Sequence, residues 1–115
     1  MSGVSRTVRR HLPSRGIMVL EAVTLHIRPG QSGDFESAFA QAEPIIRSME
    51  GYLSHQLQRC FEVEDQYLLL VRWRTLEDHT QGFRNHPDFG EWKRLLHHFY
   101  DPPPTIHHYE LVAGS

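Results

Sequence analysis

The chain has 115 residues, of which 39% are hydrophobic and 23% charged, with a formal net charge of −2, a composition typical of a single globular domain. Its one cysteine, Cys60, excludes an internal disulfide and a multi-cysteine metal site, and no apolar run approaches the roughly 20 residues of a membrane span. Residues 1–17 carry four arginines and no acid, which leaves 8 basic against 14 acidic residues, or −6, in the remainder; an acidic body argues against nucleic acid as a partner.

The N-terminal half is predicted to hold an extension, a strand and a helix. Residues 1–17 lack hydrophobic periodicity, so we expect a loose basic extension there and one domain over residues 18–115. Residues 19–28 alternate as a strand, with Glu21 as the exception on an otherwise apolar face. The helix that follows is predicted by apolar residues at helical spacing: Phe35, Ala38, Phe39, Ala42, Ile45, Ile46 and Met49.

Two further strands are predicted at residues 53–61 and 66–73, joined by a charged hairpin. One face of the second strand carries Tyr67, Leu69, Val71 and Trp73. Leu68 and Leu70 face the other way, so both sides of this strand are apolar and each side needs a cover.

A capping box marks the change from strand to helix after Trp73. Thr75 is expected to accept a hydrogen bond at the helix start, with Asp78 at the third helical position. The helix is predicted to run to about Asn85 and to end there because a His-Pro pair follows. A last strand is predicted at residues 105–112. The helix before that strand has an apolar stripe of Phe89, Trp92, Leu95, Leu96 and Phe99.

This order of elements predicts an α+β fold, a ferredoxin-like βαββ(αα)β sandwich with an antiparallel four-stranded sheet. Its helices would cover one face of the sheet. Apolar residues also occupy the expected other face: Leu20, Ala22, Leu68, Leu70, Ile106 and Val112. A second copy of the chain is the simplest way to bury this apolar face, so we expect a homodimer through the sheet face.

Several short segments, in order along the chain, carry a resemblance to a known family. They are Pro29-Gly30, Met49-Glu-Gly-Tyr52, Arg72-Trp-Arg-Thr-Leu-Glu-Asp-His79, Asn85-His-Pro-Asp-Phe89 and His107-His-Tyr-Glu-Leu111. Over residues 18–113 the chain resembles the antibiotic biosynthesis monooxygenases, which are dimeric α+β barrels. The resemblance implies cofactor-free oxidation of phenolic or quinol substrates, or haem breakdown as in other members, and some members have no known reaction.

The resemblance implies that Trp73 and His79 take part in a site. In members that oxidise phenolic rings a tryptophan at the end of this strand lines the pocket, although Trp73 equally suits an ordinary core position. His79 occupies a helical position where some members carry a polar pocket residue, and its imidazole could accept a phenolic proton near neutral pH. His55 is the alternative base, since it lies about as far from the hairpin turn as Trp73 and should face it across the strand pair.

Further residues complete the expected substrate-binding set. Tyr67 and Tyr109 are expected as hydrogen-bond donors, and Phe83 and Trp92 as apolar lining. The resemblance implies an asparagine where this chain has Leu69, so one polar contact to a substrate is missing. That departure favours a pocket that holds a ligand without oxidising it.

The favoured function is that of a cytoplasmic, cofactor-independent monooxygenase that oxidises a small electron-rich aromatic molecule with O₂. One alternative is a dimeric protein that binds a small aromatic or apolar ligand without turnover; a weaker one is haem binding or haem degradation. The favoured reaction needs no cofactor, and the sequence excludes neither haem nor flavin. Adjacent histidine pairs at 97–98 and 107–108 point apart on a helix or strand, so we expect no metal site. Neither nucleic acid nor a membrane is expected as a partner.

Overall fold

A computed structural model describes residues 18–114; the predicted basic extension at 1–17 lies outside the described residues. None of the described helices combines the length and the hydropathy needed to cross a bilayer. The elements in chain order are β1 (Val19–His26), α1 (Ser32–Arg47), β2 (Tyr52–Arg59), β3 (Gln66–Trp73), η1 (Asp78–Phe83), α2 (Phe89–Leu96), η2 (His97–Phe99) and β4 (Thr105–Glu110). η1 is a π-helical turn and η2 a 3₁₀ turn.

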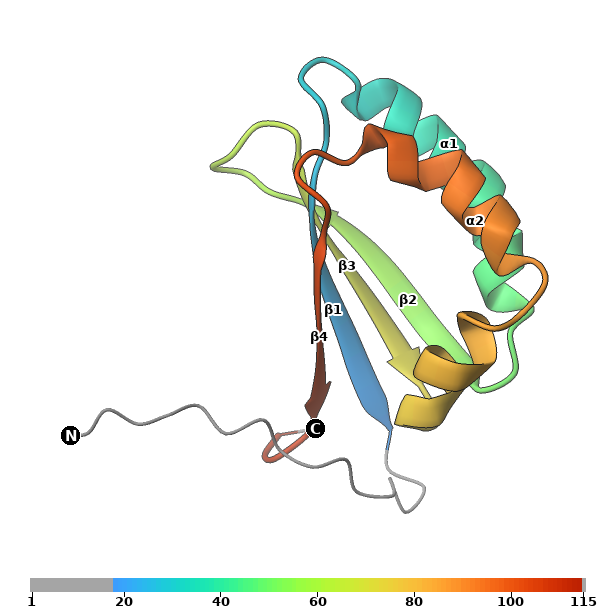
Figure 1. Ribbon diagram of the computed structural model, residues 1–115. Coiled ribbons are helices and arrows are strands. Elements are labelled where there is room, and N and C mark those ends of the chain that lie inside the picture. The colour runs from blue at the N-terminus through green and yellow to red at the C-terminus, as the bar shows by residue number, and fades with distance from the viewer. Residues whose placement is uncertain (1–17, 115) are drawn as a thin grey trace, which may run out of the picture.

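The four strands form one antiparallel sheet in the order β2-β3-β1-β4, with both helices on one face (Figure 1). This is the predicted α+β, ferredoxin-like arrangement. The last strand ends at Glu110 and is therefore shorter than the predicted 105–112. Val112 lies beyond it, with 91% of its surface exposed.

The core lies between the sheet and the two α-helices. Alternate residues of β1 and β3 point into it, as period-two alternation requires, and Trp73 and Val71 are completely buried there. The helical stripe predicted for α1 supplies the opposing layer, since Phe35, Phe39 and Ile46 are also buried. Trp73 therefore faces the helices, as the strand pattern predicted.

The predicted capping box forms at the start of the segment that leads into η1. The backbone N–H of Asp78 donates to Thr75 Oγ1 at 3.1 Å, and the backbone N–H of Thr75 donates to Asp78 Oδ2 at 3.2 Å. Each side chain thus satisfies a backbone donor of the other residue. Gly51, at φ 84°, lies so close to the Asp78 side chain that an added Cβ would be 2.2 Å from Asp78 Cγ.

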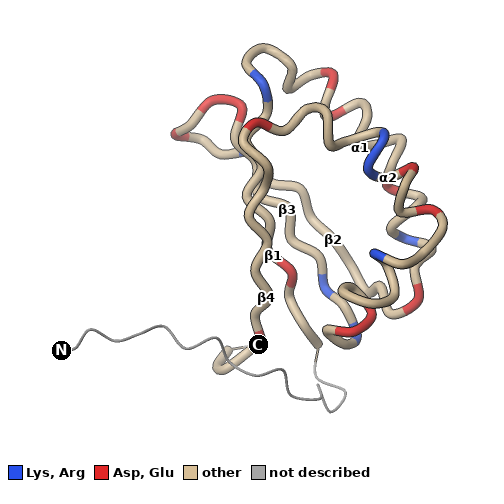
Figure 2. The backbone as a smooth tube through the Cα atoms, in the orientation of Figure 1, with Lys and Arg blue, Asp and Glu red and all other residues tan. Residues whose placement is uncertain are grey.

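The sheet face away from the helices is open in the monomer. Ile106 was expected on this face and instead faces the core, because β4 pairs with β1 so that Ile106 lies opposite Val23. The open face carries Leu20, Ala22, Leu68, Leu70 and Tyr109. Figure 2 shows charged residues concentrated on the helices and loops, with few on the strands.

Candidate active site

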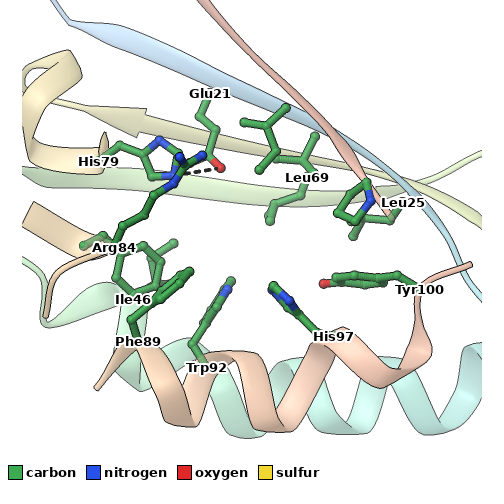
Figure 3. Close-up of a pocket in the computed structure, with 14 residues that line it drawn as sticks. Glu21, Leu25, Ile46, Leu69, His79, Arg84, Phe89, Trp92, His97 and Tyr100 are labelled. Atoms are coloured by element: carbon green, nitrogen blue, oxygen red, sulfur yellow. Dashed lines mark ion pairs between the residues drawn. The ribbon is translucent and has the colours of Figure 1, made fainter. Parts of the chain in front are cut away.

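A cavity of about 70 Å³ opens between the helix-facing side of the sheet and α2 (Figure 3). Strand residues form one wall, the end of η1 closes one side, and α2 with the chain after it forms the opposite wall. The lining residues are Glu21, Val23, Leu25, Ile46, Leu69, His79, Phe83, Arg84, Phe89, Trp92, His97, Tyr100, Pro104 and Ile106.

Glu21 is the buried acid of this cavity, with 6% of its surface exposed. The indole N–H of Trp73 donates to Glu21 Oε1 at 2.9 Å, and His79 Nε2 lies 3.3 Å from Glu21 Oε2. Burial raises the pKa of Glu21 to about 7, against the opposing effects of the Trp73 hydrogen bond and the positive charge of Arg84. A carboxyl with such a pKa both gives and takes a proton near neutrality.

His79 lies against Trp73 and is 3% exposed. The two rings stack with centroids 5.4 Å apart and planes 26° apart. The other ring nitrogen, Nδ1, is 2.8 Å from Nε2 of His108. Burial, followed by the charges of His108 and Arg84, lowers the pKa of His79 to about 3. The imidazole is therefore neutral at pH 7.

Sheet register and the helix start bring these groups together. Glu21 and His108 are directly opposite on β1 and β4. Trp73 ends the neighbouring strand, opposite Val19 and on the same face as Glu21. The capping box then turns the chain so that His79 follows the cap and folds back over the indole. Three strands and η1 thus contribute one polar group each to a single cluster, in which Glu21, Trp73 and His79 are buried and His108 is half-buried.

Aromatic side chains form the floor of the cavity. The Phe83 ring meets Phe89 and Trp92 edge-on, with centroid separations of 5.0 and 5.4 Å. At the other end His97 and Tyr100 point toward the cavity from η2 and the residue that follows it (Figure 3). Burial raises the pKa of Tyr100, and the charge of Glu21 adds to the rise, so its phenol stays protonated.

Four of the predicted site residues line this cavity: His79, Leu69, Phe83 and Trp92. Trp73 is not part of the lining, because it sits behind His79 and holds Glu21 through its N–H. Its role in the structure is to position the two polar groups that do reach the cavity.

The other three predicted residues lie elsewhere. His55 contacts Tyr52 Oη at 2.5 Å and Glu43 Oε2 at 2.6 Å, a cluster that ties β2 to α1; it pairs with Val71 and not with Trp73. Tyr67 is buried and donates to Glu36 on α1.

Tyr109 was expected as a donor in the pocket. It is 54% exposed on the open face of the sheet, where the alternation of β4 places it. Its neighbour His108 faces the core side instead.

Sequence reasoning missed Glu21, Arg84 and His108 as parts of the site. Glu21 carried a signal, because it is the one acid on an apolar strand face. Arg84 follows η1 and extends toward Glu21 and His79 (Figure 3). No sequence pattern predicts this direction of the Arg84 side chain, since it depends on how the π-helical turn ends. His108 could be identified only from the register of β4 against β1.

The site does not suit a large cofactor. Pockets for cofactor-sized or drug-sized ligands are roughly 300–1,000 Å³, so a cavity of about 70 Å³ fits neither haem nor flavin. Within residues 18–114, no group of three or more His, Cys, Asp and Glu side chains is arranged to hold a metal ion.

The fold and this site define a small ferredoxin-like domain with an aromatic-lined pocket between sheet and helices. The chain belongs to the antibiotic biosynthesis monooxygenase family, whose model matches residues 18–95. It is 55% identical over 95 residues to the uncharacterised Bacillus subtilis protein YczJ, an overlap that covers 83% of this chain and all of that protein.

Two solved structures illustrate the range of similarity. A Bordetella bronchiseptica protein assigned to the same family is 34% identical, with a TM-score of 0.81 over 84% of this chain and 99% of that one. SnoaB of Streptomyces nogalater, described as a cofactor-independent oxygenase, is 19% identical, with a TM-score of 0.67 over 86% of this chain and 95% of its own. The likeness to SnoaB shows a shared fold.

Proposed function

We propose that the protein is a cofactor-independent monooxygenase that oxidises small, single-ring phenols or quinols with O₂. The observation that carries this proposal is Glu21, a buried carboxyl with a pKa of about 7 that faces an aromatic-lined cavity. Family membership and the activity described for SnoaB support the choice of oxygenase chemistry. Glu21 replaces His79 as the base, because His79 has a pKa of about 3 and both its ring nitrogens are engaged.

The first step is removal of the substrate hydroxyl proton by Glu21. A phenol with a pKa of about 10 loses its proton to an ordinary glutamate at a cost of roughly 7 to 8 kcal/mol. With the pKa of Glu21 raised to about 7, the cost falls to about 4 kcal/mol. Arg84, which extends to the same place, stabilises the resulting anion.

The substrate supplies the electrons for the rest of the reaction. The phenolate gives one electron to O₂, and the two radicals combine to form a C–O bond at a ring carbon that carries hydrogen, para to the hydroxyl in a phenol and ortho to it in a quinol. That carbon then loses its hydrogen as a proton while the O–O bond breaks, so it becomes a carbonyl. The second oxygen takes this proton and one from solvent and leaves as water, and the proton held by Glu21 returns to solvent. Phenol and O₂ thus yield a para-quinone and water, with four electrons drawn from the substrate and no external reductant.

The size of the cavity limits the substrate to one ring. An apolar cavity of roughly 150 Å³ holds benzene, and the cavity here measures about 70 Å³. Small movements of the exposed Arg84 side chain and of the half-buried Phe89 would admit one ring against Trp92. A fused three-ring anthrone would require the helices to separate from the sheet.

A second candidate is a protein that binds a small apolar molecule without oxidising it. Leu69 favours it, because this strand residue lines the cavity and offers a substrate no polar contact. Binding of phenol to the protein under argon, with no product after O₂ is admitted, would select this candidate.

Oxygen uptake by metal-stripped protein tests the proposal. We expect single-ring phenols and hydroquinones to give uptake above the autoxidation blank, while anthrones do not. Glu21→Gln keeps an acceptor for the Trp73 N–H and should lower the rate by about a hundredfold or more. Glu43→Gln, which alters the acid beside His55 outside the cavity, is the matched control and should keep the wild-type rate. Equal uptake in wild type and Glu21→Gln would contradict the proposal.

A further inference from the structure

His108 is outside the cavity, yet it contacts His79, which reaches Glu21. His79 Nε2 is 3.3 Å from Glu21 Oε2, and His79 Nδ1 is 2.8 Å from His108 Nε2. The cavity is lined by Glu21 and His79 but not by His108. The three side chains therefore form a line that begins at the cavity wall and ends outside it.

The contacts at both ends of the His79 ring couple its tautomer to the state of Glu21. A neutral imidazole carries one N–H and one lone pair. If Glu21 is a carboxylate, Nε2 of His79 must carry the hydrogen, and Nδ1 must then accept from His108. If Glu21 is protonated and donates to Nε2, the hydrogen of His79 is on Nδ1 and points at His108.

We propose that Glu21, His79 and His108 form a proton relay through which the buried carboxyl exchanges its proton with solvent while a substrate fills the cavity. His108 is the outer residue of this relay and touches no substrate. The role of the relay in turnover rests on the proposed function; its existence as a proton path does not.

The relay step moves three protons, each to the neighbouring group. It starts with a protonated Glu21 whose Oε2 lies 3.3 Å from His79 Nε2, a contact that must tighten to a hydrogen bond for the transfer, and with His79 Nδ1–H donating to His108 Nε2. His108 loses its Nδ1 proton to water, His79 passes its Nδ1 proton to His108, and Glu21 passes its proton to His79. The result is a carboxylate, two imidazoles that have both changed tautomer, and one proton in solvent. No imidazolium is formed.

The surroundings suit a relay of neutral rings. His108 lies on β4, an edge strand, and is half-buried, so part of this residue is accessible to solvent. Burial and then Arg84 lower the pKa of His108, and His107 adds to the effect. The groups that face the line are Arg84, the Trp73 N–H and the phenol of Tyr100, while His107 lies on the opposite face of the sheet and acts on His108 only through its charge. Arg84 is the permanent cation among them, and its charge adds to burial, the larger cause, in keeping both rings neutral.

Nitrogen-15 NMR of the histidine rings tests the relay without any substrate. We expect His79 and His108 both to change from Nδ1–H at low pH to Nε2–H at high pH, at one shared midpoint. That midpoint should coincide with the carboxyl titration of Glu21, which the structure places near pH 7. Glu21→Gln should abolish the change in both rings, and His107→Gln, on the opposite sheet face, should leave it intact. Rings that keep one tautomer while Glu21 ionises, or an imidazolium at His108, would overturn the relay.

Turnover supplies a second test once a substrate is found. In dilute buffer, His108→Phe should lose about tenfold in kcat at unchanged KM, and added imidazole should restore the rate. His107→Phe is the matched control and should behave as wild type. An unchanged kcat in His108→Phe would overturn the relay. If wild-type protein oxidises none of the substrates, the proposed function fails, and the NMR titration alone decides the relay.

Discussion

Glu21 and His79 are two buried titratable groups whose pKa values are shifted in opposite directions by the same cause. Burial disfavours the charged form of each, so the pKa of the acid rises to about 7 and that of the imidazole falls to about 3. At neutral pH the cluster therefore holds at most one negative charge, which Arg84 faces. A pair of this kind is typical of acid–base sites, where burial and neighbouring charges bring pKa values into the range in which protons are exchanged.

The opposite shifts predict opposite effects of pH on stability. Because folding raises the pKa of Glu21, this residue stabilises the folded state to its full extent below pH 4.5. The stabilisation is lost as pH rises to about 7. Because folding lowers the pKa of His79, this residue stabilises the folded state to its full extent above pH 6.5. The stabilisation is lost as pH falls to about 3. Each contribution changes the free energy of unfolding by about 1 kcal/mol per pH unit.

Variants separate the two contributions. Relative to wild type, Glu21→Gln should become more stable as pH rises from 4.5 to 7, and His79→Gln should become less stable as pH rises from 3 to 6.5. Urea unfolding of the three proteins at half-unit pH intervals measures both slopes. Parallel curves for wild type and both variants would show that neither group has a shifted pKa.

At the scale of elements, the turn before β2 and the capped segment before η1 support each other. Gly51 has a φ of 84°, which favours glycine, and its carbonyl accepts from the Arg74 N–H at 2.7 Å. Asp78 fills the space where a Cβ on Gly51 would lie. The position of His79 therefore depends on a glycine far from it in the sequence.

Two glycine substitutions should change stability in opposite directions. Gly51→Ala adds a Cβ 2.2 Å from Asp78 Cγ at a positive φ, so it should lower the free energy of unfolding by roughly 1 to 3 kcal/mol. Gly90→Ala, in α2 with nothing within 4 Å of the new Cβ, should raise it by about 0.5 to 1 kcal/mol. Thermal unfolding measures both. A neutral Gly51→Ala would mean that the cap and the turn do not constrain each other.

The sequence predicted what depends on local pattern and missed what depends on pairing. The alternation around Trp73 placed it facing the helices, and the spacing of Thr75 and Asp78 predicted the capping box, which the structure confirms. The site itself required the register of β4 against β1, which places His108 opposite Glu21. That register is set by long-range packing, so no motif in a single segment reveals it. The same register explains why Ile106 faces the core.

At the scale of the whole molecule, the sheet has one covered face and one open face. The open face carries Leu20, Ala22, Leu68, Leu70 and Tyr109 in a region with few charges. Contiguous apolar surface of this kind is unfavourable in water. We propose that a second copy of the chain covers it, so that two sheets pack face to face around a two-fold axis.

Sedimentation tests the homodimer. Wild-type protein should sediment at twice the 13.4 kDa of one chain at micromolar concentration. Leu68→Glu places a charge on the open face and should give the single-chain mass. Val63→Glu, at a similarly exposed position on the hairpin, should remain dimeric. A 13.4 kDa species for wild type would contradict the dimer.

In the proposed reaction, Glu21 initiates insertion of one atom of O₂ into a single-ring phenol. Turnover of phenol under ¹⁸O₂ with mass analysis of the product tests it most directly. We expect one ¹⁸O atom in each quinone formed by wild type, with the yield rising with pH around a midpoint near 7 and little product from Glu21→Gln. A product without ¹⁸O, or equal labelling by Glu21→Gln, would contradict it.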